Sequence, residues 1–184
     1  MKKRADMLGP NKDKFVIFYN SRNARRKKTS DVLKTFAQLL NVIGQDKAFL
    51  LMKTDPHDPE GGNLIEVAKM LGLKNDQITF APNMTSQEQM ADFYNIADIT
   101  VCHSSNEGFG LSCQESLYCG TPTIVMQTGG LQEQPVDDVT GETYGVVIPP
   151  VARSLQGSQQ IPFIFDDHGS DQDFLNAYHA MYLM

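Results

Sequence analysis

The stretch ITVCHSSNEGFGLSCQESLYCGTPTIVM, residues 99–126, contains the local pattern that decides the fold. It begins and ends with short β-rich apolar runs, Ile99–Cys102 and Thr123–Met126. Between them lie a glycine-containing loop, His103–Gly110, and a helical segment, Ser112–Cys119. Runs that are apolar throughout are typical of strands buried on both faces, as in a parallel sheet. The stretch therefore predicts a strand–helix–strand unit with two parallel strands.

The same alternation extends toward the N-terminus. Phe15–Tyr19 and Ala48–Met52 are two further continuous apolar runs, and a helix is expected to begin near residues 29–31. The spacing of Thr85 and Glu88 predicts a capping box that opens another helix. The helical apolar stripes are Val32, Leu33, Phe36, Leu40 and Ile43; Leu64, Ile65, Ala68 and Leu71; and Met90, Phe93, Tyr94 and Ala97. Alternating strands and helices predict an α/β fold, a Rossmann-like three-layer sandwich with a mostly parallel sheet and right-handed crossovers.

The charge distribution divides the chain of 184 residues into a basic head and an acidic body. Ten of the 16 Lys and Arg residues lie in residues 1–30, although the formal net charge is −6. We expect residues 1–14 to be a disordered basic arm or a linker remnant, and residues 15–184 to be one domain. Val151–Phe165 has no clear period, and Asp171–Met184 has the pattern of a helix that continues to the chain end.

Composition also excludes several classes of protein. An acidic body argues against nucleic-acid binding, because such binders spread cations over one face. No apolar run approaches the ~20 residues that span a bilayer, and no apolar segment follows the basic start as in a signal peptide. Cys102, Cys113 and Cys119 form no Cys-x-x-Cys pattern, which favours a reducing cytoplasm. We therefore expect a cytoplasmic protein, with membrane association through another domain left open.

Ligands of open parallel sheets bind at the carboxyl ends of the strands. The loop after the first expected strand, Asn20–Lys28, contains five cations in seven residues and leads directly into a helix. Such a loop fits a diphosphate, because fixed cations lie beside the unpaired amides of a helix start. A solvated basic loop is the alternative interpretation. The loop Asp55–Glu60 has ligand-type residues without a recognised metal spacing, so no metal site is expected.

The loop after the fourth expected strand offers backbone amides and carboxylates. Gly108 and Gly110 allow the backbone to approach a ligand closely. Residue 113 is Cys, so the dinucleotide fingerprint is incomplete and a nicotinamide oxidoreductase is disfavoured. Glu107 and Glu115 are eight residues apart and suit two sets of sugar hydroxyls, although surface charge is the simpler interpretation.

At these residues the chain resembles family 4 glycosyltransferases. The segment from Ser105 to Thr123 resembles their Glu-x7-Glu signature, with Glu107 and Glu115 as the two carboxylates, and Gly129-Gly130-Leu131-x-Glu133 matches the motif that follows it. Arg22 and Lys27 resemble the family's diphosphate-binding pair, and Phe80–Met84 stands where the family packs the nucleotide base. The similarity extends from about Phe15 to Pro149.

The resemblance implies the donor-binding C-terminal domain of a GT-B enzyme that retains anomeric configuration and needs no metal. The nucleotide sugar, UDP- or GDP-linked, would be a substrate, so no cofactor is expected. Arg22 and Lys27 would neutralise the diphosphate, and Glu107 would orient the donor sugar. Glu115 would bind the ribose hydroxyls. The other donor-binding positions implied are Gly108, Phe109, Gly110, Leu111, Asn83, Met84, Gly129 and Gly130.

Some residues depart from the family pattern. Ser21 and Lys28 replace the usual glycines around the basic pair, so Arg26 and Lys28 are alternatives to Lys27 for the diphosphate contact. His103 stands where proline is common, and a structural role is favoured for it. The nucleotide, the sugar, the acceptor and the oligomeric state are not specified by these residues.

The chain is short for a complete GT-B enzyme, which has two such domains. We expect a hexosyltransferase part whose N-terminal acceptor domain is absent or supplied by a partner chain, and whose last helix is cut short. Alone, the chain is expected to bind the donor without turnover. The alternatives are a non-catalytic nucleotide-sugar-binding module and a domain like those of sugar-nucleotide epimerases.

Overall fold

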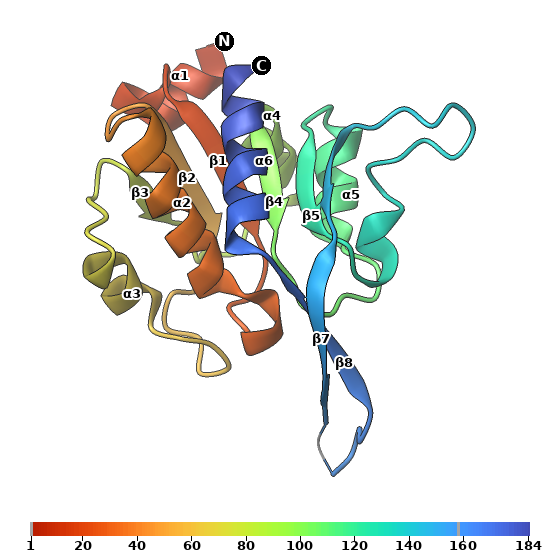
Figure 1. Ribbon diagram of the computed structural model, residues 1–184. Helices are drawn as coiled ribbons and strands as arrows, with labels where there is room; N and C mark the ends of the chain where they lie inside the picture. Colours follow the sequence, from red (N-terminus) through yellow and green to blue (C-terminus); the bar gives the residue numbers. More distant parts are fainter. Residues whose placement is uncertain (1, 158) are drawn as a thin grey trace.

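The computed structural model describes residues 2–157 and 159–184, in which six parallel strands form the central sheet (Figure 1). The strand order is β3-β2-β1-β4-β5-β6. The chain adds strands in one direction from β1 to β3 and in the other from β4 to β6, so the topological switch lies between β1 and β4. The strands are β1 Phe15–Asn20, β2 Ala48–Lys53, β3 Ile78–Phe80, β4 Ile99–Cys102, β5 Thr123–Met126 and β6 Gly145–Ile148. The α/β prediction and the four predicted strands are confirmed.

Helices cover both faces of this sheet. Helices α2 and α6 lie side by side on one face with α3 beside α2, and α4 and α5 cover the other (Figure 1). None of the described helices is long and apolar enough to cross a membrane. The helices are α1 Lys2–Leu8, α2 Thr29–Ile43, α3 Leu64–Met70, α4 Gln87–Ile96, α5 Leu111–Tyr118 and α6 Asp171–Leu183, with 3-10 turns η1 Gly9–Asn11, η2 Arg25–Lys27 and η3 Gly129–Gln132.

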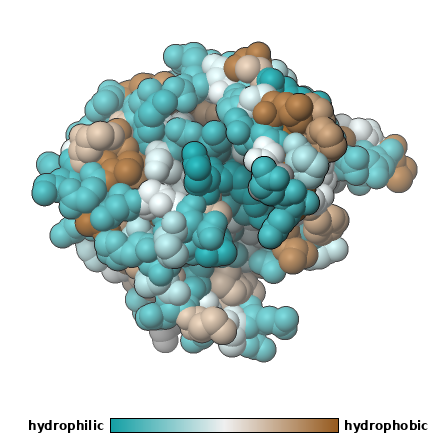
Figure 2. Space-filling model, turned by 90° about the horizontal axis from the view of Figure 1, so that it is seen from below, coloured by the Kyte–Doolittle hydropathy of each residue, from teal (hydrophilic) through white to brown (hydrophobic). Residues whose placement is uncertain are grey.

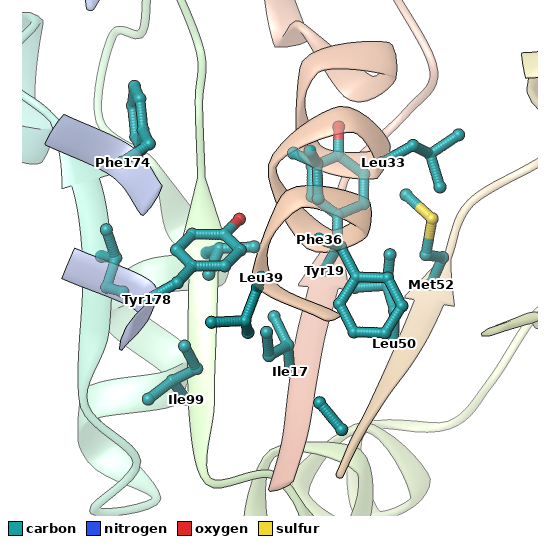
Figure 3. Close-up of a cluster of buried hydrophobic side chains, with 14 of the residues drawn as sticks. Ile17, Tyr19, Leu33, Phe36, Leu39, Leu50, Met52, Ile99, Phe174 and Tyr178 are labelled. Carbon is teal, nitrogen blue, oxygen red and sulfur yellow. The ribbon is translucent and has the colours of Figure 1, made fainter. Parts of the chain in front are cut away.

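The core consists of two layers separated by the sheet. Tyr19 of β1 packs with Phe36 of α2 and Tyr178 of α6 in the larger layer, and all three are fully buried (Figure 3). Neighbouring positions of β1 point to the opposite face, where the ring centroid of Phe18 lies 5.1 Å from that of Tyr94 in α4. Burial of each such side chain contributes roughly 1.5–3 kcal/mol. The side chains on both faces of β1 are therefore buried away from water, which explains its continuous apolar run.

The start of α4 differs by one residue from the prediction. The capping box joins Ser86 and Gln89: the Ser86 hydroxyl accepts from the Gln89 amide at 3.3 Å, and the Gln89 side chain accepts from the Ser86 amide at 3.0 Å. The prediction of Thr85 and Glu88 is wrong. Both pairs have the required spacing, but the Thr85 hydroxyl instead faces the sulfur of Met90 at 3.5 Å.

The basic N-terminal segment is packed against the domain, so the expectation of a disordered arm is wrong for residues 2–14. Arg4 donates two hydrogen bonds to the Asp98 carboxylate, at 2.9 and 2.8 Å. Asp98 also accepts from the Val16 amide at 2.7 Å, and Leu8 of α1 is buried. The composition shows that this segment is basic, but it does not indicate that Arg4 pairs with a carboxylate 94 residues away.

Two strands that the sequence pattern does not predict follow the sheet. β7 Pro150–Gln156 and β8 Ile164–Gly169 form an antiparallel hairpin that extends beyond the carboxyl edge of the sheet (Figure 1). Arg153 is opposite Asp167 in the register, and its Nε donates to Oδ1 at 2.6 Å. Most of β7 is exposed, so its sequence lacks the alternation of a strand with one buried face.

Candidate functional site

The loops that follow β1 and β4 meet at the topological switch. The Ser105 amide donates to the Arg26 carbonyl at 2.8 Å, and the Arg26 guanidinium donates to the Asn106 carbonyl at 2.9 Å. The basic loop, Asn20–Lys28, and the glycine loop, His103–Gly110, are therefore joined by hydrogen bonds to main-chain carbonyls. Seen from below, onto this carboxyl edge, the surface is mostly hydrophilic at its centre (Figure 2).

Glu107 is the centre of a charged cluster at this junction. Its Oε2 accepts from Lys27 Nζ and from the Arg26 guanidinium, the latter at 3.2 Å. Only 11% of the Glu107 side chain and 12% of the Lys27 side chain are exposed. Burial raises the pKa of Glu107, but the adjacent Lys27 and Arg26 lower it more, so the pKa lies below its ordinary value. Glu107 is therefore an ionised group that holds two cations in place.

Arg22 lies apart from this cluster. Its guanidinium forms a two-point ion pair with Asp58 in the loop after β2, at 2.7 and 3.0 Å. These hydrogen bonds hold the pKa of Asp58 below its ordinary value. The structure thus brings Lys27 and Glu107 together, with Arg26 beside them, but places Arg22 on a neighbouring loop. Asp58 is not among the predicted site residues, because the pattern of the Asp55–Glu60 loop indicates only whether a metal could bind there.

The glycines of the predicted site lie in two loops whose backbones come close to each other. The Gly130 amide donates to the Gly108 carbonyl at 3.1 Å. A Cβ on Gly129 would lie 1.7 Å from the Glu107 carbonyl oxygen, so no side chain fits there. Gly110 has φ +88°, and a Cβ there would also meet Leu131. Glycine at positions 129 and 130 is therefore required for the two loops to pack together, whereas a Cβ on Gly108 would meet no atom within 4 Å. Phe109 and Leu111, between and after these glycines, are exposed on the same rim.

Glu115 is held by a second polar group. The Tyr94 hydroxyl donates to Glu115 Oε2 at 2.7 Å and itself accepts from the Asn20 side chain at 2.8 Å. Burial raises the pKa of Tyr94, and Glu115 raises it further, so the phenol stays protonated. The sequence pattern assigned Tyr94 only to an apolar helix stripe. Its ring occupies that stripe, whereas its hydroxyl reaches the site.

The segment expected to hold a base lies at the edge of the site. Lys53 at the end of β2 donates to the Asn83 carbonyl through Nζ. Met84 is almost fully exposed, at 99%. Partial burial lowers the pKa of Lys53. Lys53 is not among the predicted site residues, although its position at the carboxyl end of a predicted strand is a signal that could have indicated it.

His103 has a structural environment, as expected. It is buried, its Nε2 lies 2.9 Å from the Tyr178 hydroxyl, and its ring stacks on Phe174 with centroids 3.7 Å apart. Burial lowers its pKa to about 3. His103 therefore remains neutral in the folded protein and anchors α6 to the end of β4.

Comparison with known proteins identifies the family. The family model described as glycosyl transferases group 1 matches residues 2–159. The chain belongs to this family. A D-inositol 3-phosphate glycosyltransferase of Streptosporangium roseum is 42% identical over 78 residues, which are 42% of this chain and 18% of the relative. The enzyme of the same name from Streptomyces bingchenggensis is 41% identical over 122 residues, 64% of this chain and 25% of the relative.

Solved glycosyltransferase structures share the fold over the whole chain. Sucrose-phosphate synthase from Thermosynechococcus elongatus has a TM-score of 0.72 at 23% identity and covers 100% of this chain and 40% of its own. The C-terminal domain of the group 1 protein LpcC from Francisella tularensis has a TM-score of 0.69 at 20% identity, over 98% of this chain and 83% of its own. This group 1 chain therefore has the Rossmann-like α/β fold of GT-B glycosyltransferases and spans a quarter or less of the curated relatives cited.

Proposed function

We propose that this chain is the donor-binding domain of a retaining, metal-independent glycosyltransferase that uses a nucleoside-diphosphate sugar without a cofactor. The observation that carries the proposal is the cluster of Lys27, Arg26 and Glu107 beside the glycine loops. It lies at the topological switch, where an open parallel sheet offers its ligand site. Family membership supports a glycosyl donor as the ligand.

The cluster suits a reaction in which charge grows on a departing group. When the bond between the anomeric carbon and the diphosphate oxygen breaks, negative charge accumulates on the diphosphate. Lys27 and Arg26, already fixed by Glu107, would stabilise that charge without reorganising. Glu107 would orient the sugar while keeping both cations in position. Arg22 joins this group by leaving Asp58 when a diphosphate is bound, since its side chain is 61% exposed.

The rest of the donor is assigned to the two flanking groups. Glu115 Oε2 is occupied by Tyr94, so Oε1 is assigned to the ribose hydroxyls. The main chain at Asn83 and Met84, steadied by Lys53, is assigned to the base. The amides of Gly108–Leu111, with Gly129 and Gly130 close behind, would bind the phosphates.

Calorimetric titration with UDP, GDP and ADP tests the donor site. We expect one of the three to bind at millimolar concentration or tighter. Glu115→Gln and Lys27→Gln should each weaken that binding about five- to tenfold, the loss of roughly 1–1.4 kcal/mol for a charge-assisted hydrogen bond. Glu142→Gln, which removes a carboxylate outside the site, is the matched control. Absence of binding by all three nucleotides, or equal affinity of the site variants, contradicts the proposal.

A non-catalytic binding module is the second candidate function. The described residues provide one side of a cleft, and the acceptor is assigned to an N-terminal domain or a partner chain in the cytoplasm. We therefore expect the chain alone to bind the donor without transferring sugar. Transfer by this chain alone, measured as release of nucleoside diphosphate with a sugar acceptor, would contradict that assignment.

A further inference from the structure

An open cavity of about 850 Å³ lies between the basic loop and the β7–β8 hairpin. One wall is the basic loop with the start of the glycine loop, and the other is the β7–β8 hairpin. It shares Arg26 with the cluster at the candidate donor site, whereas Lys27, Glu107, Gly108 and Glu115 do not line it. Its lining residues are Arg25, Arg26, Lys28, Ser105, Asn106, Gln156, Gly157, Ile161, Phe163, Ile164, Phe165, Asp166 and His168.

The first wall is strongly cationic. Arg25 and Lys28 form no ion pair among residues 2–157 and 159–184, and Arg26 shares its charge with Glu107. The facing carboxylate is Asp166, which is occupied by a hydrogen bond from the Ser105 hydroxyl at 3.0 Å. Three cations therefore face one engaged carboxylate. An anion is the complementary ligand, and a phosphate group matches several guanidinium and ammonium donors at once.

The second wall is apolar and exposed. The hairpin presents Phe163 and Phe165, which are 75% and 54% exposed, with Ile164 between them. The volume of the cavity is far larger than a phosphate ion requires. A ligand that fills it must carry an apolar body next to its anionic group, because burial of the exposed rings is favourable.

We propose that this cavity binds a phosphorylated amphiphile, with its phosphate on Arg25 and Lys28 and its apolar body on the hairpin. Arg26 lines the cavity and also contacts Glu107, so a ligand here lies next to the donor sugar. Its position beside the donor sugar rests on the proposed function, whereas binding itself does not.

Titration of the chain with n-octyl phosphate, followed by calorimetry, tests the proposal. Inorganic phosphate and n-octyl glucoside serve as probes that lack the apolar body or the charge, and both should bind more weakly. Lys28→Gly removes the charge at a backbone position that suits glycine, so it keeps the fold. It should weaken octyl phosphate binding about fivefold. Phe163→Ser, at an exposed position, should weaken octyl phosphate binding and leave inorganic phosphate unchanged.

The controls separate this site from the donor site. Lys69→Gln removes an exposed cation from α3, which does not line the cavity, and should leave all affinities unchanged. Octyl phosphate should bind equally in the presence of a saturating nucleoside diphosphate. The proposal is overturned if octyl phosphate does not bind at millimolar concentration, if Lys28→Gly binds it like the parent, or if nucleotide displaces it. If octyl phosphate binds as expected but no nucleotide does, the cavity stands and the donor function fails.

Discussion

At the scale of single residues, Lys28 is the departure from the family pattern that has the clearest structural consequence. It stands where glycine is usual, and its φ of +53° lies in the left-handed region. It is the one non-glycine residue with positive φ in the described part of the chain. A side chain in this region costs roughly 1–2 kcal/mol. In return, this position carries a cation that lines the cavity beside the hairpin.

Lys28→Gly should therefore increase the free energy of unfolding by about 0.5–1 kcal/mol, the relief of strain less the chain entropy that glycine adds. Lys28→Ala is the matched control, because it removes the same charge but keeps the Cβ. Urea unfolding of the three proteins measures the difference. If alanine stabilises the chain as much as glycine does, charge rather than backbone conformation explains the effect.

His103 links stability to pH. Burial lowers the pKa of His103 to about 3 in the folded chain. Below about pH 6.5 the imidazole therefore binds a proton in the unfolded chain but stays neutral in the folded chain. Stability should fall as the pH falls from 6.5 toward 3, by at most about 1.4 kcal/mol per pH unit from this group. His103→Phe should be less stable overall, since Tyr178 loses a partner, but its stability should depend less on pH between 5 and 6.5. Equal slopes for the two proteins would refute this account.

At the scale of elements, the start of α4 shows how local patterns compete. Thr85–Glu88 and Ser86–Gln89 both have the spacing of a capping box, and only the backbone at Ser86, extended at φ −71° and ψ 166°, decides between them. Sequence therefore predicts that the helix exists but leaves its first residue uncertain by one position.

Ser86→Ala should destabilise the chain by about 1 kcal/mol, because the Gln89 amide loses its acceptor. Thr85→Ala, one residue earlier, should cost less than half as much, since its hydroxyl contacts only the Met90 sulfur. Thermal and urea unfolding of the two variants compare them directly. A larger loss for Thr85→Ala would contradict the Ser86–Gln89 capping box and support the Thr85–Glu88 box that the sequence pattern predicts.

Elements buried on both faces were predictable, and exposed ones were not. β1, β2, β4 and β5 are continuous apolar runs because helices cover both sides of them. β3 has three residues, too few for a periodic pattern, and the hairpin strand β7 is mostly exposed. Its Val151 and Leu155 side chains are exposed, so the sequence of β7 shows no burial periodicity.

At the scale of the whole molecule, the site is assembled by topology. Motif spacing could place Glu107 and Lys27 in loops, and the strand order brings those loops together between β1 and β4. Pairings such as Arg22 with Asp58 and Tyr94 with Glu115 depend on how separate loops and helices meet. No local pattern encodes such partners, so these contacts could not be predicted from the sequence.

The same reasoning applies to the N-terminal helix, which is held by contacts to residues distant in sequence. Asp98 joins Arg4 of α1 to the Val16 amide of β1, so Asp98→Ala should cost about 2 kcal/mol by removing the Arg4 ion pair and the acceptor of the Val16 amide. Hydrogen exchange should rise in residues 2–14 while the sheet stays protected. Lys3→Ala removes the more exposed pair with Asp92 from the same helix and should cost less than about 0.5 kcal/mol. Equal losses from the two variants would show that helix packing, rather than the Asp98 bridge, holds this segment.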